Sequence, residues 1–303
     1  MPTRRLAVRT RRMLLSLAFG ASLAASPAEG QDFEGIRSVL GREGSVDEGV
    51  LRVTFPRTDV EVMLAGVALA PEALAQSWFG FWPLADGRTM LMGDVVVLVS
   101  EIQPVMEEIY RQKLEVTALH NHLIGTEPTV MFMHIRGMGE GADLARKVRA
   151  VLGRTATPLA GAEEDERPTR DWSDVRRILG AEGEVKGGLI EFVFPRTDRL
   201  MMHGQRMPST EALETASEFA LQDLGDGRAI AVGEYIVTGE EANPVVRTLK
   251  EHGYNVTALH NHMLDEEPRL LFVHFWRIGE AGELARGARA ALERTNVRLG
   301  SSR

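Results

Sequence analysis

The chain contains one sequence unit twice, and this duplication limits the folds open to it. Residues 32–59 read DFEGIRSVLGREGSVDEGVLRVTFPRTD, and residues 171–198 read DWSDVRRILGAEGEVKGGLIEFVFPRTD. A second matching pair reads EVTALHNHLIGTEPTVMFMHIRGMGEGADLARKVRAVL at 115–152 and NVTALHNHMLDEEPRLLFVHFWRIGEAGELARGARAAL at 255–292. About half of the paired positions are identical, and the offset stays at 139 or 140 residues. Self-similarity at a constant distance predicts two copies of one structural unit.

The duplication sets the expected domain boundaries. We expect a first repeat at residues 29–154 and a second repeat at residues 171–303. Residues 155–170 between them are rich in Pro, Gly, Ala and acidic side chains, which is typical of a linker. A chain of 303 residues is long enough to bury a substantial core in two domains.

The first 28 residues have the pattern of a signal peptide. An apolar run from Met13 to Ala25 leads to small residues around Ser26 and Ala28, and it is preceded by Arg4, Arg5, Arg9, Arg11 and Arg12. We therefore expect residues 1–28 to direct export to the periplasm or the extracellular space. The segment TRRMLL at 10–15 resembles a twin-arginine signal, and the basic head of a Sec signal fits it equally well.

The charge of the exported chain argues against two classes of partner. Removal of residues 1–28 leaves 30 basic and 43 acidic side chains, a net charge of −13. Such a surface repels phosphate backbones, so we expect no nucleic-acid binding. Outside the signal, no apolar run approaches the ~20 residues that a spanning helix needs, so we expect no membrane span.

The chain has no cysteine. This excludes disulfides, thiolate metal ligands, a cysteine nucleophile and a lipid-modified cysteine. Any transition-metal site must therefore be built from histidine and carboxylate.

Each repeat is expected to form a β-α-β-β-α unit on a largely antiparallel sheet. In the first repeat, Thr89 to Val99 is an apolar run rich in β-branched residues, which is typical of a buried strand. A helix, two strands and a last helix should follow, the first ending at Lys113 and the others spanning 115–123, 129–137 and 139–152. This order predicts an α+β fold made by tandem duplication.

Six of the eight histidines occupy equivalent positions in the two repeats: His120, His122, His134, His260, His262 and His274. Residues i and i+2 of a strand point to one face, so His120 and His122 should be neighbours. Pairing the two predicted strands places Phe132 opposite His120, and His134 opposite Ala118 on the same face as His120. The pattern therefore predicts three convergent imidazoles in each repeat, provided that the register does not slip.

Three histidines on two strands are typical of an open zinc site, in which three protein ligands leave a fourth position for water or a ligand. Imidazole also suits copper and nickel, so zinc is the first choice of metal rather than the only one. Zinc-bound water has a pKa near ~7, which supports hydrolysis or hydration. We expect metal affinity to fall below about pH 6, near the free histidine pKa of ~6.5.

Two pairs of acidic residues are candidates for supporting roles. Asp94 and Glu234 occupy the same position inside otherwise apolar strands, where they could orient the liganded imidazoles or point outward from a sheet edge. Glu127 and Glu267 precede a proline beside the histidines. They could serve as a catalytic general base or a fourth ligand, or they could be solvated loop acids.

The segments VTALHNH, EP and FMHIRG, repeated as VTALHNH, EP and FVHFWR, resemble the LppY/LpqO family. The resemblance covers nearly all of the chain after the signal, including the pairs Gly93-Asp94 and Gly233-Glu234 and the prolines Pro104 and Pro244. It implies exported proteins of two units and assigns no chemistry. This chain departs from the lipoproteins that name the family because it has no cysteine for a lipid anchor.

Three hypotheses follow from the sequence. The first is an exported divalent-metal-binding protein, with metal-dependent hydrolysis or hydration as the activity that its site would support. The second is a cell-envelope binding module for a small polar ligand or a protein partner. The third is a structural protein whose histidines only form hydrogen bonds. The sequence is compatible with an enzyme and with a non-enzyme, and with one shared site or two separate sites.

Overall fold

The computed structural model describes residues 33–160, 170–186, 188–225 and 227–300. The expected signal peptide at 1–28 and most of the expected linker lie outside these residues. In the first repeat the described elements are, in chain order, α1 (Glu34–Leu40), β1 (Ser45–Asp47), β2 (Val50–Pro56), β3 (Val62–Leu64), β4 (Val67–Leu69), the 3-10 helix η1 (Pro71–Ala73), β5 (Gln76–Pro83), β6 (Thr89–Leu98), η2 (Val99–Glu101), α2 (Ile102–Arg111), β7 (Glu115–His120), β8 (Thr126–Glu127), β9 (Val130–Gly139) and α3 (Gly141–Leu152).

The second repeat follows the same order. Its described elements are α4 (Ser173–Leu179), β10 (Glu184–Lys186), β11 (Leu189–Pro195), β12 (Met201–Met202), β13 (Gln205–Arg206), η3 (Glu211–Leu213), β14 (Ala216–Gly225), β15 (Arg228–Val237), α5 (Gly239–Glu251), β16 (Asn255–His260), β17 (Leu271–Glu280) and α6 (Ala281–Leu292).

Each repeat contains one six-stranded antiparallel sheet. The strand order is β1-β2-β5-β6-β9-β7 in the first repeat and β10-β11-β14-β15-β17-β16 in the second. The expected α+β duplication is confirmed, and its β-α-β-β-α unit corresponds to β6, α2, β7, β9 and α3. The strands that carry His120 and His260, β7 and β16, each lie at the edge of their sheet.

Two predicted boundaries differ from the structure for identifiable reasons. The last helix of the first repeat begins at Gly141 because the side chain of Glu140 caps it, accepting hydrogen bonds from the next backbone N–H groups. The strand predicted at 115–123 ends at His120. After this residue the backbone leaves β9, and the carbonyl of His122 accepts a hydrogen bond from Thr257 in the other repeat.

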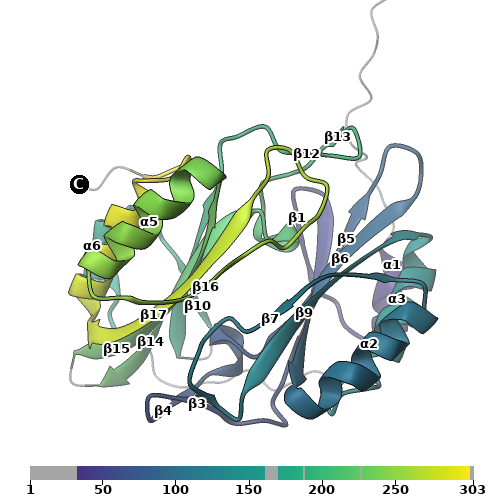
Figure 1. Ribbon diagram of the computed structural model, residues 1–303, viewed down its shortest axis with the longest axis horizontal. Helices are drawn as coiled ribbons and strands as arrows, with labels where there is room; N and C mark the ends of the chain where they lie inside the picture. The colour runs from purple at the N-terminus through teal and green to yellow at the C-terminus, as the bar shows by residue number, and fades with distance from the viewer. Residues whose placement is uncertain (1–32, 161–169, 187, 226, 301–303) are drawn as a thin grey trace, which may run out of the picture.

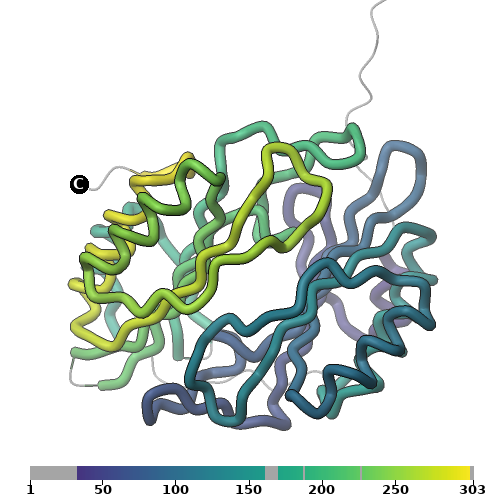
Figure 2. The backbone as a smooth tube through the Cα atoms, viewed as in Figure 1, coloured from purple at the N-terminus to yellow at the C-terminus, as the bar shows by residue number. Residues whose placement is uncertain are grey.

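The two sheets face each other, and the helices lie on the outside (Figures 1 and 2). Helices α1, α2 and α3 cover the outer face of the first sheet, and α5 and α6 cover the outer face of the second. Each helix layer encloses an apolar core of its own repeat, with Leu144 and Val148 of α3 in the first and Leu284 and Ala288 of α6 in the second. Burial of a helix stripe against a sheet face is the main stabilising interaction of each repeat.

The inner sheet faces share two further apolar cores that mix both repeats. In one, Met202 and Met207 of the second repeat pack with Trp82 and Met90 of the first. In the other, Val62 of β3 packs with residues that include Ile230 of the second repeat. A short two-stranded segment of each repeat, β3–β4 or β12–β13, therefore packs against the other repeat; we call this segment the arm of the repeat. The inner faces are buried only when both repeats are present.

The motif PRTD, present in both repeats, forms the same buried ion pairs twice. Arg57 pairs with Asp59 and Glu101, and Arg196 pairs with Asp198 and Glu241. Each arginine also donates to a backbone carbonyl two strands away, that of Val96 in β6 or Ile236 in β15. The motif thus stabilises the turn after the second strand rather than contributing to a site.

The described residues add two facts about the segments outside the repeats. The carbonyls of 158–160, at the start of the expected linker, accept hydrogen bonds from Arg42 of the first repeat. Within the described ranges, no helix is long and apolar enough to cross a membrane.

Candidate metal centre

The six paired histidines come together where the edge strands of the two sheets meet. The predicted register is confirmed, since Phe132 lies opposite His120 and His134 lies opposite Ala118. The second repeat has the same register, with Phe272 opposite His260. His122 and His262 lie just beyond the ends of β7 and β16.

A reciprocal pair of hydrogen bonds holds these loop histidines in place. Thr257 Oγ1 donates to the carbonyl of His122 over 2.6 Å, and Thr117 Oγ1 donates to the carbonyl of His262 over 2.7 Å. Each threonine belongs to the motif VTALHNH of one repeat and positions the second histidine of the same motif in the other. The repeated motif therefore links the two repeats around the histidines.

We expect replacement of Thr257 by valine to lower the free energy of unfolding by about 1 kcal/mol. Valine keeps the side-chain shape but leaves the carbonyl of His122 without this donor. Urea unfolding measures the effect, and Thr117→Val should produce a change of similar size because the contact is reciprocal. Wild-type stability in both variants would contradict the assignment.

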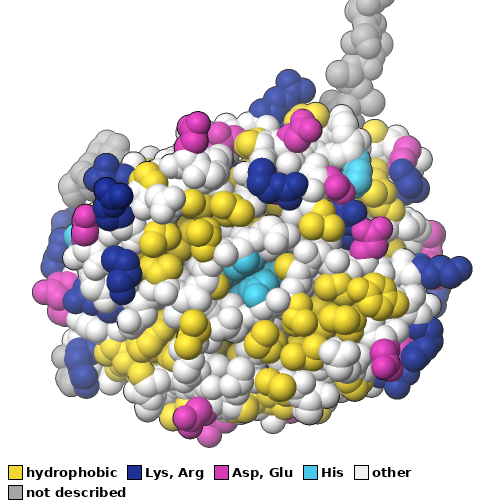
Figure 3. Space-filling view, viewed as in Figure 1, with side chains coloured by type: hydrophobic (Ala, Val, Ile, Leu, Met, Phe, Trp, Pro, Cys, Tyr) yellow, Lys and Arg dark blue, Asp and Glu magenta, His cyan; other side chains and the backbone are white. Residues whose placement is uncertain are grey.

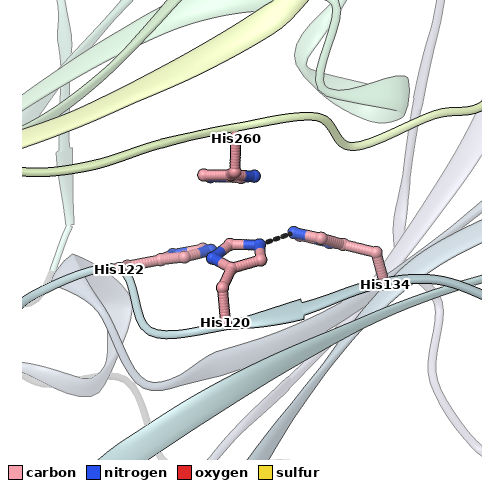
Figure 4. Close-up of side chains that lie close together, drawn as sticks. All are labelled: His120, His122, His134 and His260. Atoms are coloured by element: carbon pink, nitrogen blue, oxygen red, sulfur yellow. Dashed lines mark hydrogen bonds between the residues drawn. The ribbon is translucent and has the colours of Figure 1, made fainter.

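The imidazoles pair across the contact between the repeats (Figure 4). The ring centroids of His120 and His260 are 3.5 Å apart, and those of His122 and His274 are 3.7 Å apart. The rings of His134 and His262 are 3.8 Å apart. Figure 4 also shows His120 Nε2 directed at His134 Nε2, 2.7 Å away. The two predicted clusters therefore form one shared centre.

Asp94 and Glu234 point inward to the histidines. Asp94 lies opposite His134 and Glu234 lies opposite His274 in the sheets. Glu234 Oε2 is 3.1 Å from His274 Nε2. Asp94 directs Oδ1 to His134 Nδ1 at 3.5 Å and Oδ2 to His122 Nε2 at 3.7 Å. Both carboxylates can therefore orient the histidine ligands or act as ligands beside them.

A third carboxylate, Glu214, escaped the sequence analysis. Its Oε2 is 2.8 Å from His262 Nε2. The signal for it is weak, because Glu214 follows η3 where the offset between the repeats changes from 139 to 140, and the matching residue Ala75 is not acidic. Its backbone has φ of 47°, an unfavourable value for a residue with a side chain. Strain of this kind is concentrated at functional sites.

Potential ligand atoms form three groups, and within each group all of them lie within 4.8 Å of one another. The four-histidine group contains His120, His122, His134 and His260. The Glu234 group contains His122, His274 and Glu234, and the Glu214 group contains His134, His262 and Glu214. In the described part of the chain, every one of these groups draws on both repeats. The three predicted histidines of the first repeat lie together in the four-histidine group, whereas His260, His262 and His274 are divided among the three groups.

Burial favours the neutral form of five imidazoles of the centre, those of His120, His122, His134, His260 and His274. It lowers the pKa of His120 to about 4 and that of His260 to about 3. Burial also lowers the pKa of His122, His134 and His274 well below the ordinary value, and neighbouring histidines lower it further. A neutral imidazole has a free lone pair, which is the form that binds metal.

In the metal-free protein, we expect the ring signals of His120 and His260 to stay unchanged from about pH 7 to about pH 5.5. A pKa near 4 or 3 places their protonation below this window. Histidine NMR would measure it. A midpoint near 6.5 for either ring would contradict the result. For the same reason, we expect metal affinity to persist below the pH 6 limit derived from free histidine.

Several buried atoms of the centre find no hydrogen-bond partner among the described residues: Nε2 of His122, His260, His262 and His274, Nδ1 of His134, Oδ1 of Asp94, Oε2 of Glu214 and Oε1 of Glu234. An unpaired buried polar group costs about 1–3 kcal/mol. Even the close pair His262 Nε2 and Glu214 Oε2 lacks hydrogen-bond geometry. Their number and their mutual proximity fit a shared cation.

An acidic cavity of about 100 Å³ adjoins the Glu234 group. Its lining includes Trp78, whose ring lies 4.4 Å from the guanidinium of Arg52, and the carboxyl groups of Glu191, Glu211 and Glu218. Burial raises the pKa of Asp94, Glu218 and Glu234 well above the ordinary value, and neighbouring carboxylates raise it further. Carboxyl groups in such surroundings favour the arrival of positive charge.

The centre is also open to solvent on one face of the molecule. Figure 3 shows histidine side chains at the bottom of a hollow, with hydrophobic side chains on both sides of it. His120 and His260 are half-buried, whereas His122, His134, His262 and His274 are buried. A small molecule can therefore reach the centre from this face.

Other sequence candidates lie away from the centre. Glu127 and Glu267 are exposed, and neither belongs to a ligand group among the described residues. Their backbones pair instead with Met63 and Met201 of the arms, each within its own repeat. The carboxylates near the histidines come from strands β6 and β15 and from the residue after η3.

Comparisons with known proteins place the duplication in a family. A family model described as Domain of Unknown Function (DUF1259) matches residues 34–154 and again residues 173–294. A search of curated proteins found no match. Two solved structures align with most of the chain at low similarity. The trimeric bacterial microcompartment shell protein PduB has 13% identity and a TM-score of 0.20, covering 83% of this chain and 89% of its own. EtuB from Clostridium kluyveri has 10% identity and a TM-score of 0.20, covering 85% and 94%. Neither score carries an argument about fold or function.

Proposed function

The chain belongs to the family described as Domain of Unknown Function (DUF1259), and we propose that this protein binds divalent metal ions in the centre that its repeats build together. One observation carries the proposal. Six imidazoles and three carboxylates converge in a mostly buried volume, and most of their inward atoms find no hydrogen-bond partner among the described residues. Neutral imidazole and carboxylate are the ligands that divalent transition metals accept.

The hydrogen bonds of the outer histidines also favour metal binding over a purely structural network. His120 Nδ1 lies 3.1 Å from the carbonyl of Asn121, and His260 Nδ1 lies 2.9 Å from the carbonyl of Asn261. A carbonyl accepts only from a protonated Nδ1, so Nε2 of the neutral ring carries the lone pair. This arrangement fixes the tautomer, as is usual for metal-binding histidines; Nε2 of His260 has no hydrogen-bond partner among the described residues, and Nε2 of His120 faces His134 Nε2.

We propose zinc as the metal. Two histidines and one carboxylate, the composition of the Glu234 and Glu214 groups, make up a common catalytic zinc site with an open position. Zinc in such a site supplies water with a pKa near ~7 for hydrolysis or hydration. Glu218, buried in the acidic cavity with a raised pKa, is positioned to exchange protons beside the centre.

A second candidate function is a binding module for a small polar ligand. The hollow in Figure 3 favours it, since hydrophobic side chains flank accessible histidines there. Such a module would use the same centre to hold the polar end of the ligand. Turnover of ester or anhydride substrates by the metal-loaded protein separates the enzyme from the binding module.

We further propose an exported location, through either a Sec or a twin-arginine signal, in line with the resemblance to the LppY/LpqO family. The support is the pattern of residues 1–28. Mass spectrometry of protein recovered from the periplasm or the medium tests it. An N-terminus near Glu29 is expected, and an intact Met1 would overturn the proposal.

Elemental analysis tests the metal proposal. Protein purified from its native compartment without chelators should contain at least one zinc or similar ion per chain. Protein stripped with chelator should bind added Zn²⁺ again in calorimetry. A native protein without metal, which also binds none of Zn²⁺, Cu²⁺ or Ni²⁺ at neutral pH, would leave only the ligand-binding and structural readings.

A further inference from the structure

The three ligand groups cannot all be filled together. The four-histidine group shares His122 with the Glu234 group and His134 with the Glu214 group. The Glu234 and Glu214 groups share no residue. If each histidine binds one ion, the centre holds either one ion among four histidines or two ions in the two carboxylate groups. These are two distinct states with different stoichiometries.

Asp94 lies between the two carboxylate groups and faces one histidine of each. Its side chain is 2% exposed. Oδ2 lies 3.7 Å from His122 Nε2, which belongs to the Glu234 group, and Oδ1 lies 3.5 Å from His134 Nδ1, which belongs to the Glu214 group. One carboxylate thus directs one oxygen to each group. Oδ1 has no hydrogen-bond partner among the described residues.

Charge also favours two ions. The carboxylates of Asp94, Glu214 and Glu234 lie in one mostly buried centre, where Arg52 Nη2 is 3.7 Å from Glu214 Oε1. Three carboxylates carry a charge of −3 when ionised. Two ions in the carboxylate groups would be bound by Glu234 and Glu214 respectively, whereas an ion among the four histidines would have no carboxylate ligand. Buried charges are stable only when they are compensated in this way.

The geometry points to a pair of divalent ions bridged by Asp94, and we propose that the centre binds them at the same time. One ion is held by His122, His274 and Glu234, and the other by His134, His262 and Glu214. This inference rests on the proposed function, because it specifies how the same centre is loaded. His120 and His260 remain at the solvent side, where an incoming ligand would meet them.

A difference between the two repeats explains why Asp94 can bridge the two ions. Asp94 and Glu234 occupy equivalent positions, but aspartate is shorter by one methylene group. Glu234 reaches His274 at 3.1 Å, whereas Asp94 stays at 3.5 Å or more from both histidines that it faces. Glu214, which has no acidic counterpart in the first repeat, supplies the direct carboxylate of the second ion. The departure from symmetry leaves Asp94 between the two groups.

Calorimetric titration of the metal-free full chain with Zn²⁺ tests the inference. We expect two equivalents in the wild type and one in both His262→Gln and His274→Gln, because each variant damages only one carboxylate group. His120→Gln should keep two equivalents, since His120 belongs to neither group. If a single ion sits among the four histidines, the pattern reverses, and only His120→Gln loses binding. That result would overturn the paired-ion proposal and leave the metal-binding function intact.

Electron paramagnetic resonance of Mn²⁺-loaded wild type provides a test that needs no variant. Two ions bridged by a carboxylate should produce a spin-coupled signal, and Asp94→Asn should lose this coupling and bind the second ion about tenfold or more weakly. An uncoupled signal together with one equivalent of Zn²⁺ would reject the pair. Binding of no metal at all would reject both the pair and the proposed function.

Discussion

Replacing His122 and His134 together with alanine should abolish divalent-metal binding. Each of the three ligand groups contains at least one of these two residues, and the four-histidine group contains both of them. The loss is therefore expected whether the protein holds one ion or two. Elemental analysis and Zn²⁺ calorimetry measure it, with an expected fall from one or two equivalents to none.

The matched control is His203→Ala with His252→Ala. Both histidines are exposed and belong to no ligand group in the described part of the chain. The control should bind metal as the wild type does. Because His134 is 0% exposed, the double variant His122→Gln with His134→Gln, which keeps more of the side-chain volume, checks that lost binding is not lost folding. Wild-type stoichiometry in a folded double variant would contradict the assignment of the centre.

Removal of metal should lower the melting temperature by about 5–10 °C. A ligand present at 100 times its dissociation constant stabilises the folded state by about 2.7 kcal/mol, and each kcal/mol corresponds to about 2–4 °C in a chain of this size class. The physical reason is that the bound ion compensates buried carboxylates and imidazoles that otherwise find no hydrogen-bond partner among the described residues. Scanning calorimetry with and without chelator measures the shift.

Chelator should leave the melting temperature of the variant His122→Ala with His134→Ala unchanged, since that variant has no complete ligand group left. An equal shift in variant and wild type would mean that the chelator acts elsewhere. No shift in a wild type shown to contain metal would mean that the ion is held without stabilising the fold.

The crossed arrangement of ligands has a consequence for the two repeats. The Glu234 group takes His122 from the first repeat and the rest from the second, and the Glu214 group takes only His134 from the first. Thr117 and Thr257 add reciprocal hydrogen bonds across the same contact. The centre therefore exists only where both repeats meet, and neither repeat contains a complete carboxylate group.

The register around the histidines could be predicted from the sequence because strand geometry is local. A period of two places His120 and His134 on one face once the short connection sets the pairing, and Ala118 does lie opposite His134. The same rule turns Asp94 toward His134 on the neighbouring strand. The α+β duplication and the antiparallel sheets were predictable for the same reason, since each depends on patterns within one repeat.

The rest depended on contacts between residues far apart in the chain. Nothing in a single repeat indicates that His122 lies against His274 or that His262 lies against His134, because the packing of one sheet face on the other decides it. Glu214 joins the site only through a local change of offset and an unfavourable backbone conformation. The pKa of His120 is lowered by burial, and Glu127 is exposed. The degree of burial of a side chain is decided only in the folded molecule.

The sequence by itself thus determined the repeat unit, the strand register and the identity of the six histidines, and it left open whether Asp94 and Glu234 face inward. Only the tertiary structure decided that these residues form one centre with shared ligand groups. The period-two pattern of a strand depends on residues a few positions apart, and each repeat contains this pattern. Distances between side chains of different repeats arise when two apolar sheet faces exclude water from each other, and no pattern within one repeat encodes that contact.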